Sequence, residues 1–217
     1  MGKQKEENES WGRFVLDVVI IWAVLMGIFF LLFRFVLSND TVSGPSMEPS
    51  FENGQRLISV RHAAIKRGEV VIVKAPDEPG ALYIKRVIGL PGEKIVSKNN
   101  QIYINGKKLA QPWLAQGRKM EDTATDTSFA ATQNFTMKSL ARSRQFAQYY
   151  TKSQLTYINQ QNRIPKGTYF VMGDHRSVSK DSRYIGTIKR KNIVGVVKLR
   201  YWPFNQFKVY KKSDDFL

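Results

Sequence analysis

The feature that most constrains this chain is an apolar run from Val18 to Leu37, in which Arg34 is the one charged residue. Twenty residues of α-helix are about 30 Å long, which matches the hydrocarbon core of a bilayer. The run is long for the apolar region of a cleaved signal peptide, and no A-x-A cleavage site follows it. We therefore expect an uncleaved signal anchor that crosses a membrane once.

The charged residues around this run predict its orientation. Three Lys or Arg residues precede the run, whereas residues 38–55 contain none. The positive-inside rule then places the N-terminus in the cytoplasm. We expect a polar, mobile cytoplasmic tail at residues 1–13, a transmembrane anchor at 14–38 and an extracytoplasmic domain at 39–217.

The domain after the anchor carries the whole formal net charge of +16. The first 38 residues contain four Lys or Arg residues and four Asp or Glu residues, which cancel. A large positive charge favours nucleic acid or an anionic membrane surface as a partner. Because the chain has a membrane span, we expect an anionic lipid surface and no nucleic acid.

The chain has no cysteine and two histidines, His62 and His175. The absence of cysteine excludes a thiol nucleophile, a disulfide framework and a thiolate metal site. The two histidines are far apart in the sequence and lack the spacing of metal ligands. We expect neither a metal nor another cofactor.

The sequence after the anchor predicts a mainly β domain. Amphipathic helices, which parallel strands would need between them, are mostly missing, so the expected sheet is antiparallel. Asn105-Gly106 is typical of a two-residue type I′ hairpin turn. Seven segments rich in β-branched residues lie between turn signals, and these are Arg56–Val60, Glu69–Lys74, Leu82–Ile88, Lys94–Ser97, Gln101–Leu109, Gly167–Met172 and Ile193–Tyr201.

Residues 113–163 differ from the rest of this domain. They are rich in Gln, Thr, Ser and Ala, and their hydrophobic periodicity is weak. We expect a variable insertion that is part loop and part helix, with the helical part around Met137–Tyr150.

The main candidate nucleophile is Ser46, which follows the anchor closely. Pro45 and Pro49 flank it, and Gly44 precedes it. Proline fixes φ and glycine tolerates unusual backbone conformations, so this stretch follows a stiff path from which a serine can project its hydroxyl. The alternative is a Pro/Ser-rich linker between the anchor and the domain.

A nucleophilic serine needs a base. A Ser-His-Asp triad is possible in principle, but neither histidine lies in a context typical of one. Lys85 is the better candidate, since it lies in a predicted strand on the face that it shares with Tyr83 and Val87. Burial on that face would favour the neutral amine, which can accept a proton. The alternative is a solvated lysine on an edge strand.

The stretch Gly173–Arg183 is rich in Asp and Arg. These side chains either balance one another in a solvated loop or form a network that orients the base. Ser177–Lys180 also matches S-x-x-K, the nucleophile motif of penicillin-binding enzymes. Those enzymes need S-D-N and K-T-G as well, and neither occurs here, so we reject that interpretation.

Together, these stretches resemble type I signal peptidases, the Ser-Lys proteases that remove signal peptides from exported proteins. The resemblance covers most of residues 39–110 and 165–205, and the single N-terminal span is similar to the form common in Gram-positive bacteria. The matching segments follow the order found in that family, and they are Ser43–Ser50, Arg67–Val71, Tyr83–Glu93 and Gly173–Arg183.

The resemblance implies a membrane-bound serine endopeptidase that cleaves preproteins after small residues in an A-x-A pattern. It implies that Ser46 is the nucleophile and Lys85 the general base of an acyl-enzyme mechanism, with Ser179 orienting the lysine. The substrate would bind as an added β-strand.

The same resemblance assigns supporting roles to further residues. Asp181 and Arg183 would form a structural ion pair near the site, and Asp174 and Arg176 would support the turn. Four residues would line the pockets for small substrate side chains, and these are Met47, Phe51, Tyr83 and Ile84.

The sequence departs from the family pattern at two positions. His175 stands where the family often has Asn, and we expect a tolerated loop change rather than a catalytic histidine. Gly44 stands where some members have a side-chain oxyanion donor, and Ser43 lies one residue further from the nucleophile. We therefore expect the oxyanion hole to use the backbone N–H of Ser46.

Two other functions fit parts of the sequence. A self-cleaving repressor also uses a serine and a lysine, but it would need a helix-turn-helix module, and this chain has a membrane span instead. A non-catalytic, membrane-tethered binder of anionic polymer would use the charge of +16. Acylation of Ser46 by a serine-directed inhibitor would separate an enzyme from such a binder.

Overall fold

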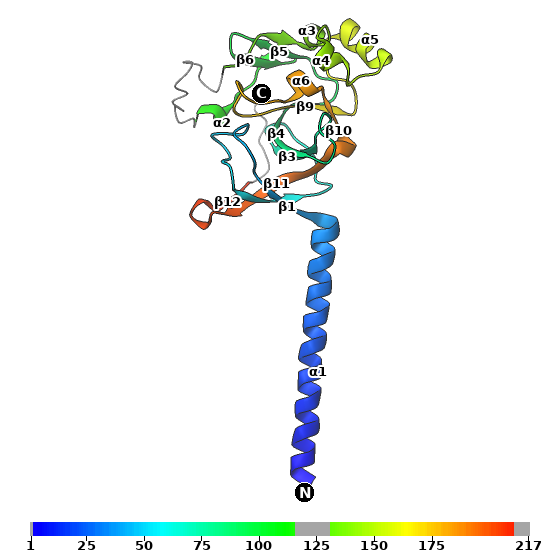
Figure 1. The fold of residues 1–217 in the computed structure, drawn as a ribbon, viewed down its shortest axis with the longest axis vertical. Helices are drawn as coiled ribbons and strands as arrows, with labels where there is room; N and C mark the ends of the chain where they lie inside the picture. The colour runs from blue at the N-terminus through cyan, green and yellow to red at the C-terminus, as the bar shows by residue number, and fades with distance from the viewer. Residues whose placement is uncertain (1, 116–130, 211–217) are drawn as a thin grey trace.

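The computed structural model describes residues 2–115 and 131–210, which form a long N-terminal helix and a β-rich domain (Figure 1). Helix α1 runs from Gly2 to Leu31, continues as one π-helical turn at Leu32–Val36 and leads directly into strand β1, Leu37–Thr41. The structure thus continues the helix through the residues that we expected as a mobile tail. It also begins the domain at Leu37, slightly before the predicted boundary.

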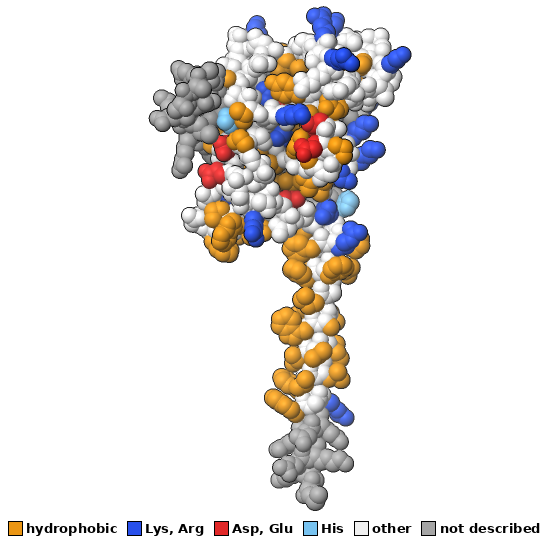
Figure 2. Space-filling model, in the orientation of Figure 1, with side chains coloured by type: hydrophobic (Ala, Val, Ile, Leu, Met, Phe, Trp, Pro, Cys, Tyr) orange, Lys and Arg blue, Asp and Glu red, His pale blue; other side chains and the backbone are white. Residues whose placement is uncertain are grey.

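The apolar part of α1 projects away from the domain. The segment Trp11–Val36 is long and apolar enough to cross a membrane, and its most apolar window contains no buried residue. Apolar side chains cover this segment on both sides in Figure 2. Length, composition and exposure together identify α1 as a candidate membrane anchor.

The main sheet has eight strands, and every pairing in it is antiparallel. The strands lie in the order β1-β2-β11-β3-β4-β9-β10, and β12 pairs with β11. Apart from β1, they are β2 (Arg56–Val60), β3 (Val70–Lys74), β4 (Leu82–Gly89), β9 (Thr168–Met172), β10 (Ile188–Lys189), β11 (Ile193–Trp202) and β12 (Lys208–Val209). The predicted antiparallel fold class is confirmed.

A second, smaller sheet has the order β7-β6-β5-β8. Its strands are β5 (Ile95–Lys98), β6 (Gln101–Ile104), β7 (Lys107–Lys108) and β8 (Phe135–Thr136). The turn between β6 and β7 has φ of 49° at Asn105 and 87° at Gly106. Both central residues of a type I′ turn need positive φ, so the predicted hairpin is confirmed. The predicted segment Gln101–Leu109 accordingly contains two short strands, one on each side of this turn.

Residues 131–163 contain more structure than we expected. The helical part predicted around Met137–Tyr150 consists of two short helices, α3 (Met137–Leu140) and α4 (Arg144–Ala147), with a turn between them. The longer helix α5, Lys152–Gln161, was not predicted, although a capping box between Thr151 and Gln154 marks its start. The rest of the insertion's described part includes α2, Pro112–Ala115.

Three apolar clusters hold the domain together. The first lies between the small sheet and the insertion and contains Phe135, Met137, Phe146 and Ile158, so the insertion is part of the core. The other two contain alternate residues of β3 and β4, with Ile84 in one and Val87 in the other. Strand β4 is therefore packed on both faces, and its backbone is a firm support for the residues that it presents.

Candidate active site

Ser46 lies in a tight loop between β1 and β2. The backbone N–H groups of Val42 and Gly54 donate hydrogen bonds to the carbonyl oxygens of Gln55 and Val42, at 2.8 and 2.9 Å, and these bonds close the loop at its base. Gly44 has φ of 79°, a conformation that favours glycine, so this residue allows the chain to turn just before the serine. The loop holds Ser46 on the side that faces β4.

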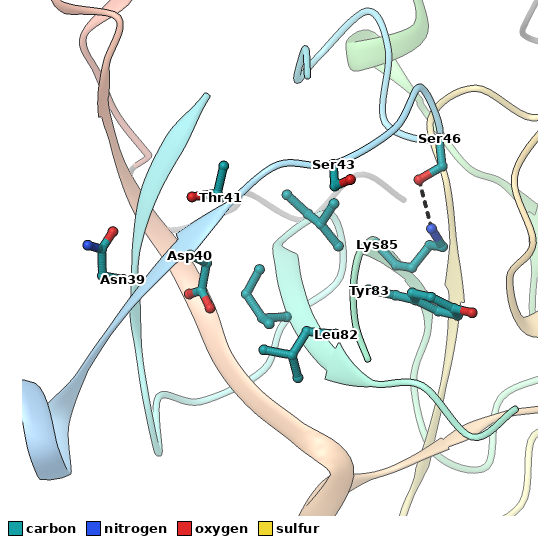
Figure 3. Close-up of a pocket in the computed structure, with 10 residues that line it drawn as sticks. Asn39, Asp40, Thr41, Ser43, Ser46, Leu82, Tyr83 and Lys85 are labelled. Atoms are coloured by element: carbon teal, nitrogen blue, oxygen red, sulfur yellow. Dashed lines mark hydrogen bonds between the residues drawn. The ribbon is translucent and has the colours of Figure 1, made fainter. Parts of the chain in front are cut away.

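Lys85 lies in β4 opposite Val71 of β3, and its side chain points at the serine. Its Nζ forms a hydrogen bond with Ser46 Oγ, drawn as a dashed line in Figure 3. The two atoms are 2.8 Å apart, and Lys85 is 3% exposed. The Tyr83 ring lies 5.3 Å from Nζ, on the same face of the strand. The structure thus brings together the two residues that the sequence pairs, and Lys85 is buried rather than solvated.

Burial changes the protonation of Lys85. Desolvation lowers the pKa of its amine to about 8, while the carboxylates of Asp181 and Asp174 act in the opposite direction. A charged amine loses hydration when it is buried, so the neutral form becomes accessible near physiological pH. A neutral amine within hydrogen-bond reach of a hydroxyl can act as its general base.

Asp181 and Arg183 form the predicted ion pair below this dyad. The Arg183 guanidinium donates to both carboxylate oxygens of Asp181 at 2.8 Å, and Asp181 has no exposed surface. The same carboxylate accepts a hydrogen bond from the N–H of Gly173. The pair therefore ties the start of the 173–183 turn to its end.

Asp174 and Arg176 also lie in this turn, but they do not pair with each other. Asp174 accepts two hydrogen bonds from Arg86, at 2.8 and 2.5 Å, and this buried ion pair fastens the turn to β4 next to Lys85. Arg176 donates instead to the carbonyl of Gly173 and to the side chain of Gln111. Arg86 is a residue that the sequence analysis missed. Its signal was an arginine inside an apolar strand, where an unpaired charge would be costly.

Ser179 and Gly173 lie close to the dyad. Ser179 Oγ is buried and has no hydrogen-bond partner among the described residues, so the expected hydrogen bond to Lys85 is not formed in this structure. A Cβ atom added at Gly173 would overlap this hydroxyl and the carbonyl oxygen of Ser46. Gly173 is a second residue that the sequence analysis missed, and it is what lets the turn approach the nucleophile so closely.

A pocket of about 220 Å³ opens beside the dyad. The predicted pocket residues Tyr83 and Ile84 lie on its wall. Met47 and Phe51 do not, because both are fully buried in the apolar cluster beneath Ile84. The structure therefore places these two residues behind the lining residues, where they anchor the serine loop, and their direct role in the substrate pockets stays a prediction.

The two sides of this pocket are backbone edges. Residues 82–85 of β4 pair with β3 on one side, and within the described chain the pairing with β9 begins only at Arg86. β1 pairs with β2 and is the last strand at its end of the sheet. Residues of both strands line the pocket, so unpaired N–H and C=O groups face it from two directions.

The contacts around Ser46 concern the two positions at which the sequence departs from the family pattern, the oxyanion donor and His175. The N–H of Ser46 donates no hydrogen bond to any described residue, which leaves it available to an oxyanion. Ser43 lies on the pocket wall. His175 donates its backbone N–H to the carbonyl oxygen of Ser46, and its Nδ1 lies 4.0 Å from Glu48 Oε2, so its imidazole is directed at a carboxylate rather than at the serine hydroxyl.

The arrangement supplies a hydroxyl nucleophile, a buried amine base and a backbone donor next to an open pocket. This set fits acyl transfer by covalent catalysis. Within residues 2–115 and 131–210, no group of three or more His, Cys, Asp or Glu side chains could hold a metal ion.

The chain is similar in sequence to known proteins over most of its length. The family described as signal peptidase, peptidase S26, matches residues 15–202. A signal peptidase IB of Staphylococcus aureus (strain COL) is 36% identical over 200 residues, which cover 89% of this chain and 93% of that protein. A signal peptidase I of Streptococcus pneumoniae is 34% identical over 208 residues, which cover 93% and 96%. A crystal structure of a signal peptidase I from Enterococcus faecalis V583 is 30% identical, covers 62% of this chain and 97% of its own, and has a TM-score of 0.46.

Proposed function

The chain belongs to the signal peptidase family, peptidase S26, and on this basis we propose that it cleaves signal peptides with Ser46 as nucleophile and Lys85 as general base. The observation that carries the proposal is the distance of 2.8 Å between Ser46 Oγ and the buried Nζ of Lys85 (Figure 3). Burial supplies the chemical reason, since it lowers the pKa of this amine to about 8.

The reaction has two acyl-transfer steps. Neutral Lys85 takes the proton of Ser46 as Oγ bonds to the scissile carbonyl carbon, and the N–H of Ser46 stabilises the oxyanion. The lysine then gives this proton to the leaving amine as the C–N bond breaks, which frees the mature protein. Water gives a proton to Lys85, attacks the acyl-enzyme and releases the signal peptide, and the hydroxyl of Ser46 is restored.

The 173–183 turn positions the base in this mechanism. Asp181 and Arg183 hold the turn together, and Asp174 fastens it to Arg86, the neighbour of Lys85. Arg176 completes the turn through its bond to Gly173. Ser179 has a free buried hydroxyl beside the dyad, which orients Lys85 once the amine is neutral and can accept a hydrogen bond.

The substrate binds as an extended strand between the free edges of β1 and residues 82–85. Main-chain hydrogen bonds to both edges would give affinity, and side-chain pockets would give selectivity. Tyr83 and Ile84 narrow the wall next to the dyad. A pocket that is narrow at this point favours small substrate residues close to the scissile bond, in agreement with an A-x-A pattern.

The catalytic domain lies on the extracytoplasmic surface of the membrane. Its orientation follows from the three Lys or Arg residues before the span and their absence from residues 38–55. Exposed apolar side chains lie at the end of the domain from which α1 leaves (Figures 1 and 2), and they are Trp202, Phe204, Phe207 and Val209. Exposed aromatic residues favour the bilayer interface, and the charge of +16 favours anionic lipid there.

Two variants of the full chain in detergent test this function. Ser46→Ala and Lys85→Ala should each abolish cleavage of a preprotein, and the double variant should be about as inactive as either, because the two residues act as one unit. A serine-directed acylating inhibitor should label the wild type at Ser46 and leave Ser46→Ala unlabelled. Substantial turnover by Ser46→Ala would refute the assignment of the nucleophile.

A further inference from the structure

The pocket beside the dyad is chemically asymmetric. Ser46 and Lys85 lie at one end, and the Asp40 carboxylate points into the pocket from β1 on the side of Leu82 (Figure 3). The rest of the wall is mixed: Asn39, Thr41 and Ser43 are polar, and Ile72 and Leu82 give it an apolar part. Asp40 is the one acidic residue among those that line the pocket, and the catalytic mechanism does not use it.

The position of Asp40 is fixed by two serines. Its Oδ1 accepts a hydrogen bond from Ser38 Oγ at 3.1 Å, and its Oδ2 accepts one from the buried Ser59 at 2.8 Å. Each carboxylate oxygen can accept two hydrogen bonds, so each keeps one lone pair for a further donor. None of the ion pairs formed between described residues includes Asp40.

We propose that Asp40 is a specificity-determining residue that selects a Lys or Arg side chain of the substrate. This inference rests on the proposed function and names part of its substrate class. A substrate cation would supply the missing partner, and its long aliphatic stem would pack along Ile72 and Leu82 while its charged end reaches Asp40. An acidic substrate residue at the same position would be repelled.

The structure also limits where that residue lies in the substrate. Asp40 precedes Ser46 by six residues, a chain length that spans at most about 20 Å. An extended substrate rises about 3.3 Å per residue, so the selected side chain lies within about six residues of the scissile bond. It lies on the signal-peptide side, because that side carries the recognition pattern of secretory substrates.

The test uses a set of peptides that share one A-x-A cleavage site. In each peptide one position from −2 to −6, other than the alanines, carries Lys, Met or Glu, with Met as an uncharged residue of similar length. kcat/KM is measured for the full chain in detergent as wild type, Asp40→Asn and Asp40→Lys. The matched control is Glu52→Gln, which removes the same charge from an exposed position outside the pocket.

The wild type should prefer Lys over Met by about ten-fold at one position, the size expected for a hydrogen bond to a charged group. Asp40→Asn should lose this preference, Asp40→Lys should prefer Glu there, and Glu52→Gln should behave as the wild type. The preference of the wild type should fall with added salt, because the pair is partly exposed.

Two failures are distinguishable in this experiment. If the wild type cleaves none of the peptides, the proposed function fails. If it cleaves them without a preference for Lys at any position, or if Asp40→Asn keeps the wild-type preference, this inference is overturned while the proposed function stands. The wild-type comparison alone decides the point if both Asp40 variants unfold.

Discussion

Burial disfavours the protonated form of Lys85. The titration of this lysine should therefore be visible as a pH dependence of the cleavage rate. In the proposed mechanism the neutral amine is the active form, so kcat/KM should rise with pH and level off above an apparent pKa near 8. The measurement is a pH–rate profile on an A-x-A peptide. His62→Ala and His175→Ala should keep this profile. A rising limb near 6.5, the ordinary value for histidine, that disappears in His175→Ala would contradict a lysine base.

The same burial of Lys85 should lower the free energy of unfolding of the domain. The lysine has a pKa of about 8 in the folded chain and an ordinary value of 10.5, so below pH 8 both states bind the proton and the folded state bears the full cost. The difference corresponds to roughly 3 kcal/mol. Lys85→Met should thus be inactive yet unfold at higher urea concentration than the wild type at pH 7. Its advantage should shrink between pH 8 and pH 10.5, where the unfolded wild type holds more protons than the folded one. An equal or lower stability of Lys85→Met at pH 7 would contradict this account.

Gly173 should be a sensitive position even though its side chain takes no part in the proposed chemistry. A methyl group there would overlap the Ser46 carbonyl oxygen and Ser179 Oγ, so Gly173→Ala should displace the nucleophile. A shift of about 1 Å can cost a hundred-fold in rate, and we expect a loss of kcat of that order. Ser177→Ala, an exposed change in the same turn, is the control and should be fully active. Wild-type kcat in Gly173→Ala would mean that the turn can move without moving Ser46.

The pairing of Ser46 with Lys85 could be predicted from the sequence, whereas many of the contacts that hold the two residues in position could not. Stiff backbone around Ser46 and an apolar strand around Lys85 are local signals. The partner of Asp174 is Arg86, 88 positions away, and neither residue's neighbours in the chain reveal the other. The family resemblance placed Met47 and Phe51 at the pockets, whereas the loop turns their side chains into the core, a direction that their neighbours in the chain do not reveal.

At the scale of elements, the helices of the insertion should matter for the stability of the whole domain. Phe146 of α4 is fully buried among residues of both sheets. Phe146→Ala should lower the free energy of unfolding by about 3–5 kcal/mol, the usual cost of a large cavity. Lys152→Ala, at the exposed start of α5, should change it by about 0.5 kcal/mol or less. Urea denaturation of the full chain in detergent measures both changes. A small effect of Phe146→Ala would mean that packing of the insertion contributes little to the stability of the domain.

Elements were predictable where their sequence pattern was strong. Segments rich in β-branched residues between turn signals located the central strands closely, because packing and propensity agree there. β1 has the polar sequence Leu-Ser-Asn-Asp-Thr, and it is a strand because β2 pairs with it, not because of its own composition. The turn between α3 and α4 could not be predicted either, since Ala141 and Arg142 are good helix formers that tertiary packing overrides.

At the scale of the whole molecule, the proposed orientation makes a direct prediction. A protease added outside intact spheroplasts should digest the chain beyond Ser38, because the positive-inside rule places that part outside. An epitope tag at the N-terminus should survive until the membrane is permeabilised. Protection of the catalytic domain in intact spheroplasts would show that the orientation is reversed.

The direct passage from α1 into β1 through a single helical turn has a consequence for how substrates are found. No linker separates α1 from the domain, so an α1 that spans the bilayer, as we propose, would hold the pocket at a nearly constant height above it. A preprotein that is held in the same bilayer by its own apolar segment meets the enzyme by lateral diffusion, in two dimensions instead of three. Selection would then depend on the number of residues between the bilayer surface and the scissile bond as well as on the side-chain pattern, since a bond at another height could not reach Ser46.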